Sequence, residues 1–415
     1  MAVTNPATVS GQGKNVYSSE HGSGIVKNVV ILVIAQVAAM ALWFVTAAIL
    51  GDMTREVALS SGASAALSSA VQGGFVIGAL FSAFTGISDR FPPKWVFAIS
   101  VWLGAAATAM LLVVPVGSMQ AILLRGFTGL CLAGVYPVGM KIAIGWSKKH
   151  RGFLVGLLVG GLTLGSAAPY LLTWFGGADW RSAIVVSCLL AACAGVLILF
   201  TENGPLHATS ARFDMRTLNY AWTNRDVRRA FGGYLGHMWE LYVMWAWVGF
   251  ALAISFSQQI DADSAQDLAK LVTFFVIASG AVSCAVAGRM ADVIGKAELT
   301  IITMVVSGSS ALLFALFFGG PVWLMILISL IWGISIIPDS AQFSALVADF
   351  TPAENAGSLM TFQTALGFAL TTITVQLAPA VAAVIGWPWL MALLALGPIF
   401  GIYSMWGLRG RGGSA

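Results

Sequence analysis

Charged residues are scarce in this chain. Asp, Glu, Lys and Arg together make up 9% of its 415 residues, whereas 58% of the residues are hydrophobic. Soluble domains carry roughly a quarter charged residues. The composition therefore excludes an ordinary water-soluble globular protein and predicts a chain that is surrounded by lipid.

Cysteine and the short motifs of soluble enzymes are also rare or missing. The chain has no CxxC pattern, and it has no Walker phosphate loop, GxSxG nucleophile elbow or HExxH zinc motif. We therefore expect no enzyme, no cofactor, no metal site and no ATP-driven pump. The cysteines all lie in apolar runs, which argues against a disulfide framework; they are Cys131, Cys188, Cys193 and Cys284.

Long hydrophobic runs are what the sequence has instead. An α-helix needs about 20 apolar residues to cross a hydrocarbon core of about 30 Å, and lipid offers no hydrogen-bond partner to an open backbone. We therefore predict an all-α integral membrane protein with twelve transmembrane helices. The predicted spans are residues 26–50, 63–86, 95–115, 119–144, 152–175, 182–201, 229–257, 268–290, 297–318, 322–348, 356–379 and 385–408.

The positive charges are distributed unevenly between the two sides of the predicted membrane. Most of the 21 Lys and Arg residues fall on the same side as the N-terminus, and only Arg55, Arg181 and Lys270 fall on the other side. The positive-inside rule then predicts that both termini are cytoplasmic, in the inner membrane. This distribution accounts for the net charge of +4 without a nucleic-acid partner.

The longest polar interruption divides the chain into two parts of six spans each. It runs from Thr201 to Arg229. We predict a cytoplasmic N-terminal segment and tail, two six-helix bundles and a central cytoplasmic loop. The boundaries are 1–25 for the segment, 26–201 for the first bundle, 202–228 for the loop, 229–408 for the second bundle and 409–415 for the tail.

The two halves repeat one another at matching places. "TGISDRFPPK" follows the second span and "GRMADVIGK" follows the eighth; Tyr136-Pro137 in the fourth span matches Ile337-Pro338 in the tenth. Such repeats indicate duplication. With the loop motif in both halves and Arg125 in the fourth span, the chain resembles the major facilitator superfamily of secondary transporters. The first motif departs from the family pattern at Pro92-Pro93, where a glycine and a cation are common.

The resemblance implies two pseudo-symmetric bundles around a central cavity, walled mainly by spans one, four, seven and ten, which opens alternately to each side. Transporters built from repeats place the solute site near the middle of the membrane. The resemblance also implies a gating role for Asp89, Arg90, Asp292 and Lys296. It places Asp89 near the start of span eleven and Asp292 near the start of span five.

Two ionisable residues in span seven stand out from apolar neighbours. In "YLGHMWELYVMWAWV", His237 and Glu240 are three residues apart and could share a hydrogen bond. Counting from Arg229 at about 1.5 Å per residue puts Glu240 about 16 Å into the membrane, where the neutral form of a carboxylate is favoured. We interpret the pair as a proton-coupling site. The alternative is a neutral pair that holds span seven to a neighbour.

The remaining intramembrane charges are further candidates, since such residues are costly in lipid. Asp339 follows Pro338, whose missing N–H leaves a carbonyl of span ten unpaired, and we add it to the proton-coupling residues. Arg125 cannot shed its charge and could bind an anion or form a structural ion pair, while Lys141 could bind solute or extend to the interface. The predicted solute-binding residues are Trp43, Arg125, Tyr136, Lys141, Tyr242 and Gln342.

These residues predict a secondary active transporter that moves a small polar, anionic solute together with protons by alternating access. We expect its partners to be the solute, protons and the lipid bilayer, and we expect it to function as a monomer. A cation or metal importer or a drug exporter of the same fold is one alternative. A transport-inactive membrane sensor or assembly factor is another, because a fold alone does not prove a function.

Overall fold

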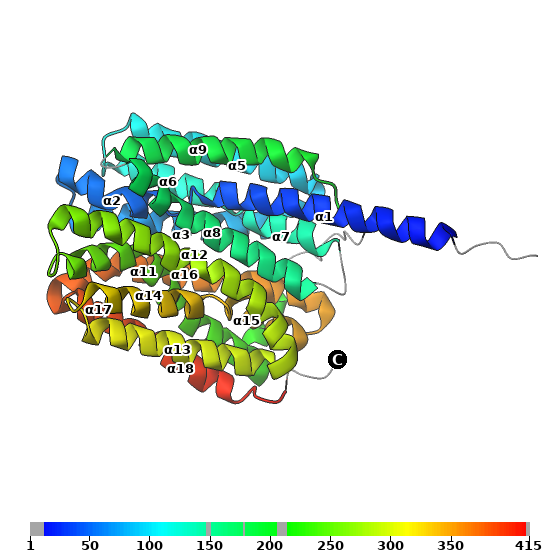
Figure 1. Ribbon diagram of the computed structural model, residues 1–415. Helices are drawn as coiled ribbons and strands as arrows, with labels where there is room; N and C mark the ends of the chain where they lie inside the picture. Colours follow the sequence, from blue (N-terminus) through cyan, green and yellow to red (C-terminus); the bar gives the residue numbers. More distant parts are fainter. Residues whose placement is uncertain (1–11, 147–150, 177–178, 206–213, 412–415) are drawn as a thin grey trace, which may run out of the picture.

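The protein is a bundle of long α-helices whose two ends lie on the same side (Figure 1). The computed structural model describes residues 12–146, 151–176, 179–205 and 214–411. Among these described residues, twelve helical segments are long and apolar enough to cross a membrane, so the twelve-span prediction is confirmed. We call the side at which α1 begins and α18 ends the terminal side, and the other side the far side.

The first half of the molecule contains spans one to six, and the second half contains spans seven to twelve. Each span is one helix or two consecutive helices, with η denoting a short 3-10 helix. The first half consists of α1 (Gln12–Met40), α2 (Val45–Glu56), α3 (Ser61–Thr85), α4 (Ile87–Arg90), α5 (Pro93–Ala109), η1 (Met110–Leu112), α6 (Met119–Leu132), α7 (Tyr136–Ile144), α8 (Arg151–Gly176), α9 (Trp180–Leu197) and η2 (Ile198–Phe200).

A loop that carries η3 and α10 leads into the second half. The elements from this loop to the end are η3 (Met215–Asn219), α10 (Tyr220–Thr223), α11 (Arg225–Phe256), α12 (Ala262–Ile294), α13 (Lys296–Leu316), α14 (Val322–Ile336), α15 (Ser340–Asp349), α16 (Ala353–Ile385), α17 (Trp387–Leu394) and α18 (Leu396–Trp406).

Local sequence signals determine where several spans begin. The side chains of Ser60, Ser118 and Asn224 accept hydrogen bonds from the first free backbone N–H groups of α3, α6 and α11, as N-cap residues do. Between α12 and α13, Gly295 has a φ of 100°, a conformation that side chains with a Cβ rarely adopt. The second copy of the loop motif therefore needs its glycine to make the turn.

Spans one, four and ten are each broken near their middle, whereas span seven is the continuous helix α11. Span one breaks at residues 41–44, span four at 133–135 and span ten at 337–339. The latter two breaks lie beside Pro137 and Pro338, which cannot donate a helical hydrogen bond. The two proline sites that suggested duplication thus have the same structural effect, and they put irregular backbone in the interior of the bundle.

Glycines bring helices of the first half into close contact. A Cβ on Gly74 of α3 would overlap the backbone oxygen of Gly126 in α6, and one on Gly129 would overlap the backbone oxygen of Val71. Small residues let membrane helices approach until their backbones touch. The packing of α3 on α6 therefore depends on these positions having no side chain.

The two halves meet mainly through α8 against α12 and α3 against α16. Figure 1 shows α8 and α12 side by side between the two halves. Here too glycines allow the approach, because a Cβ on Gly156 would lie 3.0 Å from the oxygen of Cys284 and one on Gly160 would lie 2.9 Å from the oxygen of Ala281. Gly156 and Gly160 of span five are thus part of the contact between the halves.

Candidate functional site

His237 and Asp339 form the buried ionisable pair at the centre of the second half. His237 lies on α11, and Asp339 lies in the break between α14 and α15. Their Nδ1 and Oδ1 atoms are 3.0 Å apart, and the side chains are 1% and 2% exposed. The imidazole also contacts the rings of Tyr234 and Phe343, with centroids 6.2 and 5.6 Å away. Its Nε2 is buried and has no hydrogen-bond partner.

Glu240 has different partners from those that its spacing suggests. Its Oε2 accepts a hydrogen bond from the Ser307 hydroxyl at 3.0 Å, and its Oε1 accepts one from Trp332 Nε1 at 2.7 Å. The hydrogen bond that the spacing of His237 and Glu240 allows is not formed, because His237 faces Asp339 whereas Glu240 faces Ser307 and Trp332. Glu240 joins α11 to α13 and α14, all within the second half.

Arg125 is fully buried at the break in span one. Its Nη2 donates to the backbone oxygens of Leu42 and Trp43, at 3.0 and 2.7 Å. Carbonyl groups at the end of a helix lack helical partners and carry partial negative charge. The guanidinium therefore supplies hydrogen-bond donors to two carbonyl groups that the break leaves unpaired. Its Nε and Nη1 are buried without a hydrogen-bond partner.

A layer of aromatic rings lies between the halves next to this break. Trp43 contacts Tyr242 of α11 and Phe368 of α16, with ring centroids 6.0 and 5.6 Å apart. Phe75 of α3 contacts Phe368 at 4.5 Å, and Phe44 packs on Tyr242 at 5.9 Å. The predicted residues Trp43 and Tyr242 are thus brought together across the two halves.

Buried amide side chains lie on the terminal side of this aromatic layer. Gln36 of α1 and Gln363 of α16 are fully buried, and the Nε2 atom of each has no hydrogen-bond partner. Both lie about three turns into their spans, counted from the terminal side, as His237 does. Gln342 of α15 is buried as well. Gln342 is one of the predicted solute-binding residues. Gln36 and Gln363 are not among them, although each is a lone amide in an apolar run.

The predicted residues of span four lie on its terminal-side portion. Tyr136 is the first residue of α7, directly after the break, and Lys141 follows on the same helix; both are half-buried. Gly139 of α7 approaches Gln36 so closely that a Cβ there would lie 2.6 Å from its Oε1. The terminal-side helix of span four, α7, therefore adjoins the amide side chain of span one.

The predicted gating residues have varied surroundings on the terminal side. Arg90 and Asp292 are exposed, and Lys296 forms an ion pair with Asp349 at the end of α15, at 2.5 Å. The side chains of Asp89 and of the first residues of spans five and eleven lie outside what the structure describes. The docking of Asp89 and Asp292 on those helix starts therefore stays a prediction.

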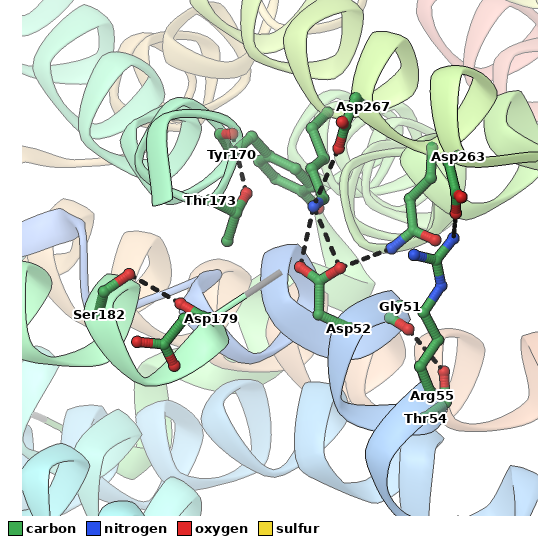
Figure 2. Close-up of polar contacts among 12 residues, drawn as sticks. Gly51, Asp52, Thr54, Arg55, Tyr170, Thr173, Asp179, Ser182, Asp263 and Asp267 are labelled. Carbon is green, nitrogen blue, oxygen red and sulfur yellow. Dashed lines mark hydrogen bonds and ion pairs between the residues drawn. The ribbon is translucent and has the colours of Figure 1, made fainter. Parts of the chain in front are cut away.

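Charged residues near the far-side ends of spans one and eight join the two halves. Asp52 at the end of span one contacts Lys270 of α12 at 3.0 Å, and Arg55 contacts Asp263 at 3.1 Å (Figure 2). In the sequence, Asp52 and Arg55 stand out as charged residues in the polar stretch "GDMTRE", which directly follows an apolar run. Within the part of the chain that the structure describes, no three His, Cys, Asp or Glu side chains gather as a metal site would require.

Solved structures of two transporters share this fold. The xylose transporter XylE from E. coli, in a partially occluded inward-open conformation, matches with a TM-score of 0.73 at 14% sequence identity, over 95% of this chain and all of that one. The nucleoside transporter NupG matches with a TM-score of 0.70 at 15% identity, and a point mutant of NupG matches with 0.71 at 16%; both cover 92% of this chain and 99% of the other.

Sequence comparison supports the same grouping. No curated protein matches the chain. The family model described as Major Facilitator Superfamily matches residues 32–262, more than half of the chain. This match, the twelve spans and the shared fold together identify the chain as a member of the major facilitator superfamily, a multi-pass membrane transporter and not an enzyme.

Proposed function

We propose that this protein is a proton-coupled secondary transporter of a small polar solute and that His237 and Asp339 are its protonation site. The observation that supports the proposal is their 3.0 Å contact in the buried interior. One member of the pair lies on the continuous helix of span seven, and the other lies in the break of span ten. A shift of α15 relative to α11 would therefore change the distance between them.

The charge of the pair explains how it couples to transport. When His237 binds a second proton and becomes an imidazolium, it forms an ion pair of zero net charge with the Asp339 carboxylate. Loss of that proton leaves the carboxylate beside a neutral imidazole in a buried site, which is costly. Proton release therefore requires water to reach the pair, and water reaches it only in a conformation that opens the site. Proton movement and conformational change become linked.

Glu240 has a different role in this proposal. Its two hydrogen bonds to Ser307 and Trp332 hold three helices of the second half together. No group of the first half takes part in them. These contacts favour a helix-holding role for Glu240 over a coupling role.

The proposed solute is anionic because of Arg125. A guanidinium stays charged even when buried, and the Nε and Nη1 atoms of Arg125 have no hydrogen-bond partner. An anion near the break in span one would satisfy both. A neutral solute is the second candidate, because the amide nitrogens of Gln36 and Gln363 have no hydrogen-bond partner. In addition, the structurally similar XylE and NupG are described as transporters of xylose and nucleosides.

Uptake into proteoliposomes with an imposed pH gradient tests the proposal. The panel contains small carboxylates, inorganic anions, sugars and nucleosides, together with metal cations and cationic drugs to test for a metal importer or a drug exporter. We expect at least one anion to accumulate above its outside concentration, and only with the gradient. Accumulation of a sugar or nucleoside instead would support the neutral candidate, and flux of no solute would favour a transport-inactive protein.

A further inference from the structure

A buried ion pair joins the two halves on the far side of the molecule. Lys270 Nζ of α12 donates to Asp52 Oδ1 at 3.1 Å and lies 3.0 Å from Oδ2. Only 7% of the lysine side chain and 1% of the aspartate side chain are exposed. Asp52, which is labelled in Figure 2, belongs to α2 in the first half, and Lys270 belongs to α12 in the second half.

Further polar groups contact both members of the pair. Gln266 Nε2 donates a second hydrogen bond to Asp52 Oδ1 at 2.7 Å, and Asp267 lies 3.5 Å from the lysine ammonium. Gly51 makes room for this arrangement, because a Cβ there would lie 2.9 Å from Gln266 Nε2. Buried ion pairs need such additional hydrogen bonds to offset the loss of water.

A second ion pair lies close by and provides a natural comparison. Arg55 and Asp263 also join α2 to the start of α12, at 3.1 Å, but their side chains are 47% and 86% exposed. Exposed ion pairs contribute little to stability because water and salt screen them. The two pairs therefore connect the same two segments but differ in how much water surrounds them.

Other polar contacts close the same side. Ser69 of α3 donates to Gln376 of α16 at 2.7 Å, and the Tyr170 hydroxyl of α8 donates to the backbone oxygen of Trp245 at 2.9 Å. Each of these contacts also joins the first half to the second. The structure is therefore a conformation in which the halves are in contact on the far side.

We propose that Asp52 and Lys270 form a latch that holds the halves together on the far side and sets how often that side opens. Separating the halves there pulls the two charges apart. Removing one charge leaves the other buried without its partner, which destabilises the closed conformation. Opening then becomes more frequent, since the population of a minor conformation follows its free energy relative to the major one. The inference rests on the membership in the superfamily and not on the identity of the solute.

The reactivity of a buried reporter cysteine measures this opening. Thr273 of α12 is fully buried one turn from Lys270, so Thr273→Cys is introduced after the four native cysteines are replaced by alanine. The purified full-length protein is labelled with a water-soluble maleimide. We expect Asp52→Asn to label about tenfold faster than the parent, and the charge-reversed pair Asp52→Lys with Lys270→Asp to label within about threefold of it. Asp263→Asn, the exposed control, should label at the parent rate.

Two results would overturn the latch. One is a folded Asp52→Asn variant that labels at the parent rate, and the other is a reversed pair that labels as fast as Asp52→Asn. If the single variant does not give monodisperse protein, the reversed pair is compared with the double variant Asp52→Asn with Lys270→Met. The latch requires the uncharged double variant to label faster than the reversed pair, and equal rates contradict it.

Discussion

His237 and Asp339 face each other across 3.0 Å, one on a helix that crosses the membrane without interruption and the other at a break beside a proline. The contact connects spans seven and ten, two of the spans that wall the cavity in the family resemblance. A pair in this position has two properties at once. It is protected from water in the present conformation, and it is attached to a segment whose backbone is already interrupted.

Replacing Asp339 by Asn should uncouple transport from protons. The amide keeps the size of the carboxylate but carries no charge, so a proton bound by His237 would create a buried cation without its counter-charge, and proton binding at the site becomes unfavourable. We expect accumulation driven by a pH gradient to fall at least tenfold, while exchange of labelled for unlabelled solute at equal pH continues. Both are measured in proteoliposomes.

The matched control for this variant is Asp349→Asn. Asp349 is the last residue of α15, the helix that begins directly after Asp339, and it forms an ion pair with Lys296 on the terminal side. Its replacement therefore changes the charge of a nearby segment without altering the contact between His237 and Asp339. Accumulation by Asp349→Asn should remain within about twofold of the parent. A gradient-driven accumulation that survives in Asp339→Asn would remove the coupling role from the pair.

Glu240→Gln should lower stability and leave coupling intact. Glutamine keeps the shape of the side chain but weakens its two acceptor contacts to Ser307 and Trp332. Hydrogen bonds between membrane helices contribute about 0.6 kcal/mol each on average, so we expect a loss of about 1 kcal/mol. Thermal unfolding in detergent measures the loss, and uptake with a pH gradient tests the coupling. Loss of accumulation in well-folded Glu240→Gln would return this residue to the coupling site.

Much of this architecture follows from the sequence because lipid imposes simple rules. Each run of about 20 apolar residues has to become a helix, so the spans can be counted. A proline inside such a run has to interrupt hydrogen bonding, which locates the break beside Asp339. Glycine at a sharp turn likewise identifies the loop after span eight. These features depend on residues that are near one another in the chain.

The partners of the charged side chains could not be predicted in the same way. The spacing of His237 and Glu240 allows a mutual hydrogen bond, but it does not reveal which neighbouring helix each side chain faces. From the sequence, Lys270 is a cation near one end of span eight. Only the packing of α12 beside α2 shows that it contacts Asp52. Such contacts join residues far apart in the chain, and one sequence contains no direct signal for them.

Arg125→Gln distinguishes an anion-binding role from a structural one. Glutamine is shorter than arginine by about two bonds, so it removes both the positive charge and the hydrogen bonds to the backbone oxygens of Leu42 and Trp43. If Arg125 binds the anionic solute, the KM of transport should rise about tenfold or more in variant protein that remains folded. A lower unfolding temperature with unchanged KM would instead assign Arg125 to the break in span one.

A single added methyl group should have opposite effects on the stability of the protein at the two adjacent glycines of α3, Gly73 and Gly74. On Gly74, a Cβ would overlap the backbone oxygen of Gly126, and backbone cannot move aside without separating α3 from α6. Overpacking of this kind costs about 1 to 3 kcal/mol or more. On Gly73, the nearest atom to a Cβ is a methyl carbon of Thr372 at 3.4 Å, an ordinary contact.

Gly74→Ala should therefore unfold at a lower temperature than the parent, or fail to give monodisperse protein, whereas Gly73→Ala should be as stable as the parent or more so. Alanine in a helix is favoured over glycine by about 1 kcal/mol, and this preference is the same at both positions. Any difference between the two variants must then arise from tertiary packing. Equal unfolding temperatures would mean that α3 and α6 are farther apart than the close approach of Gly74 and Gly126 requires.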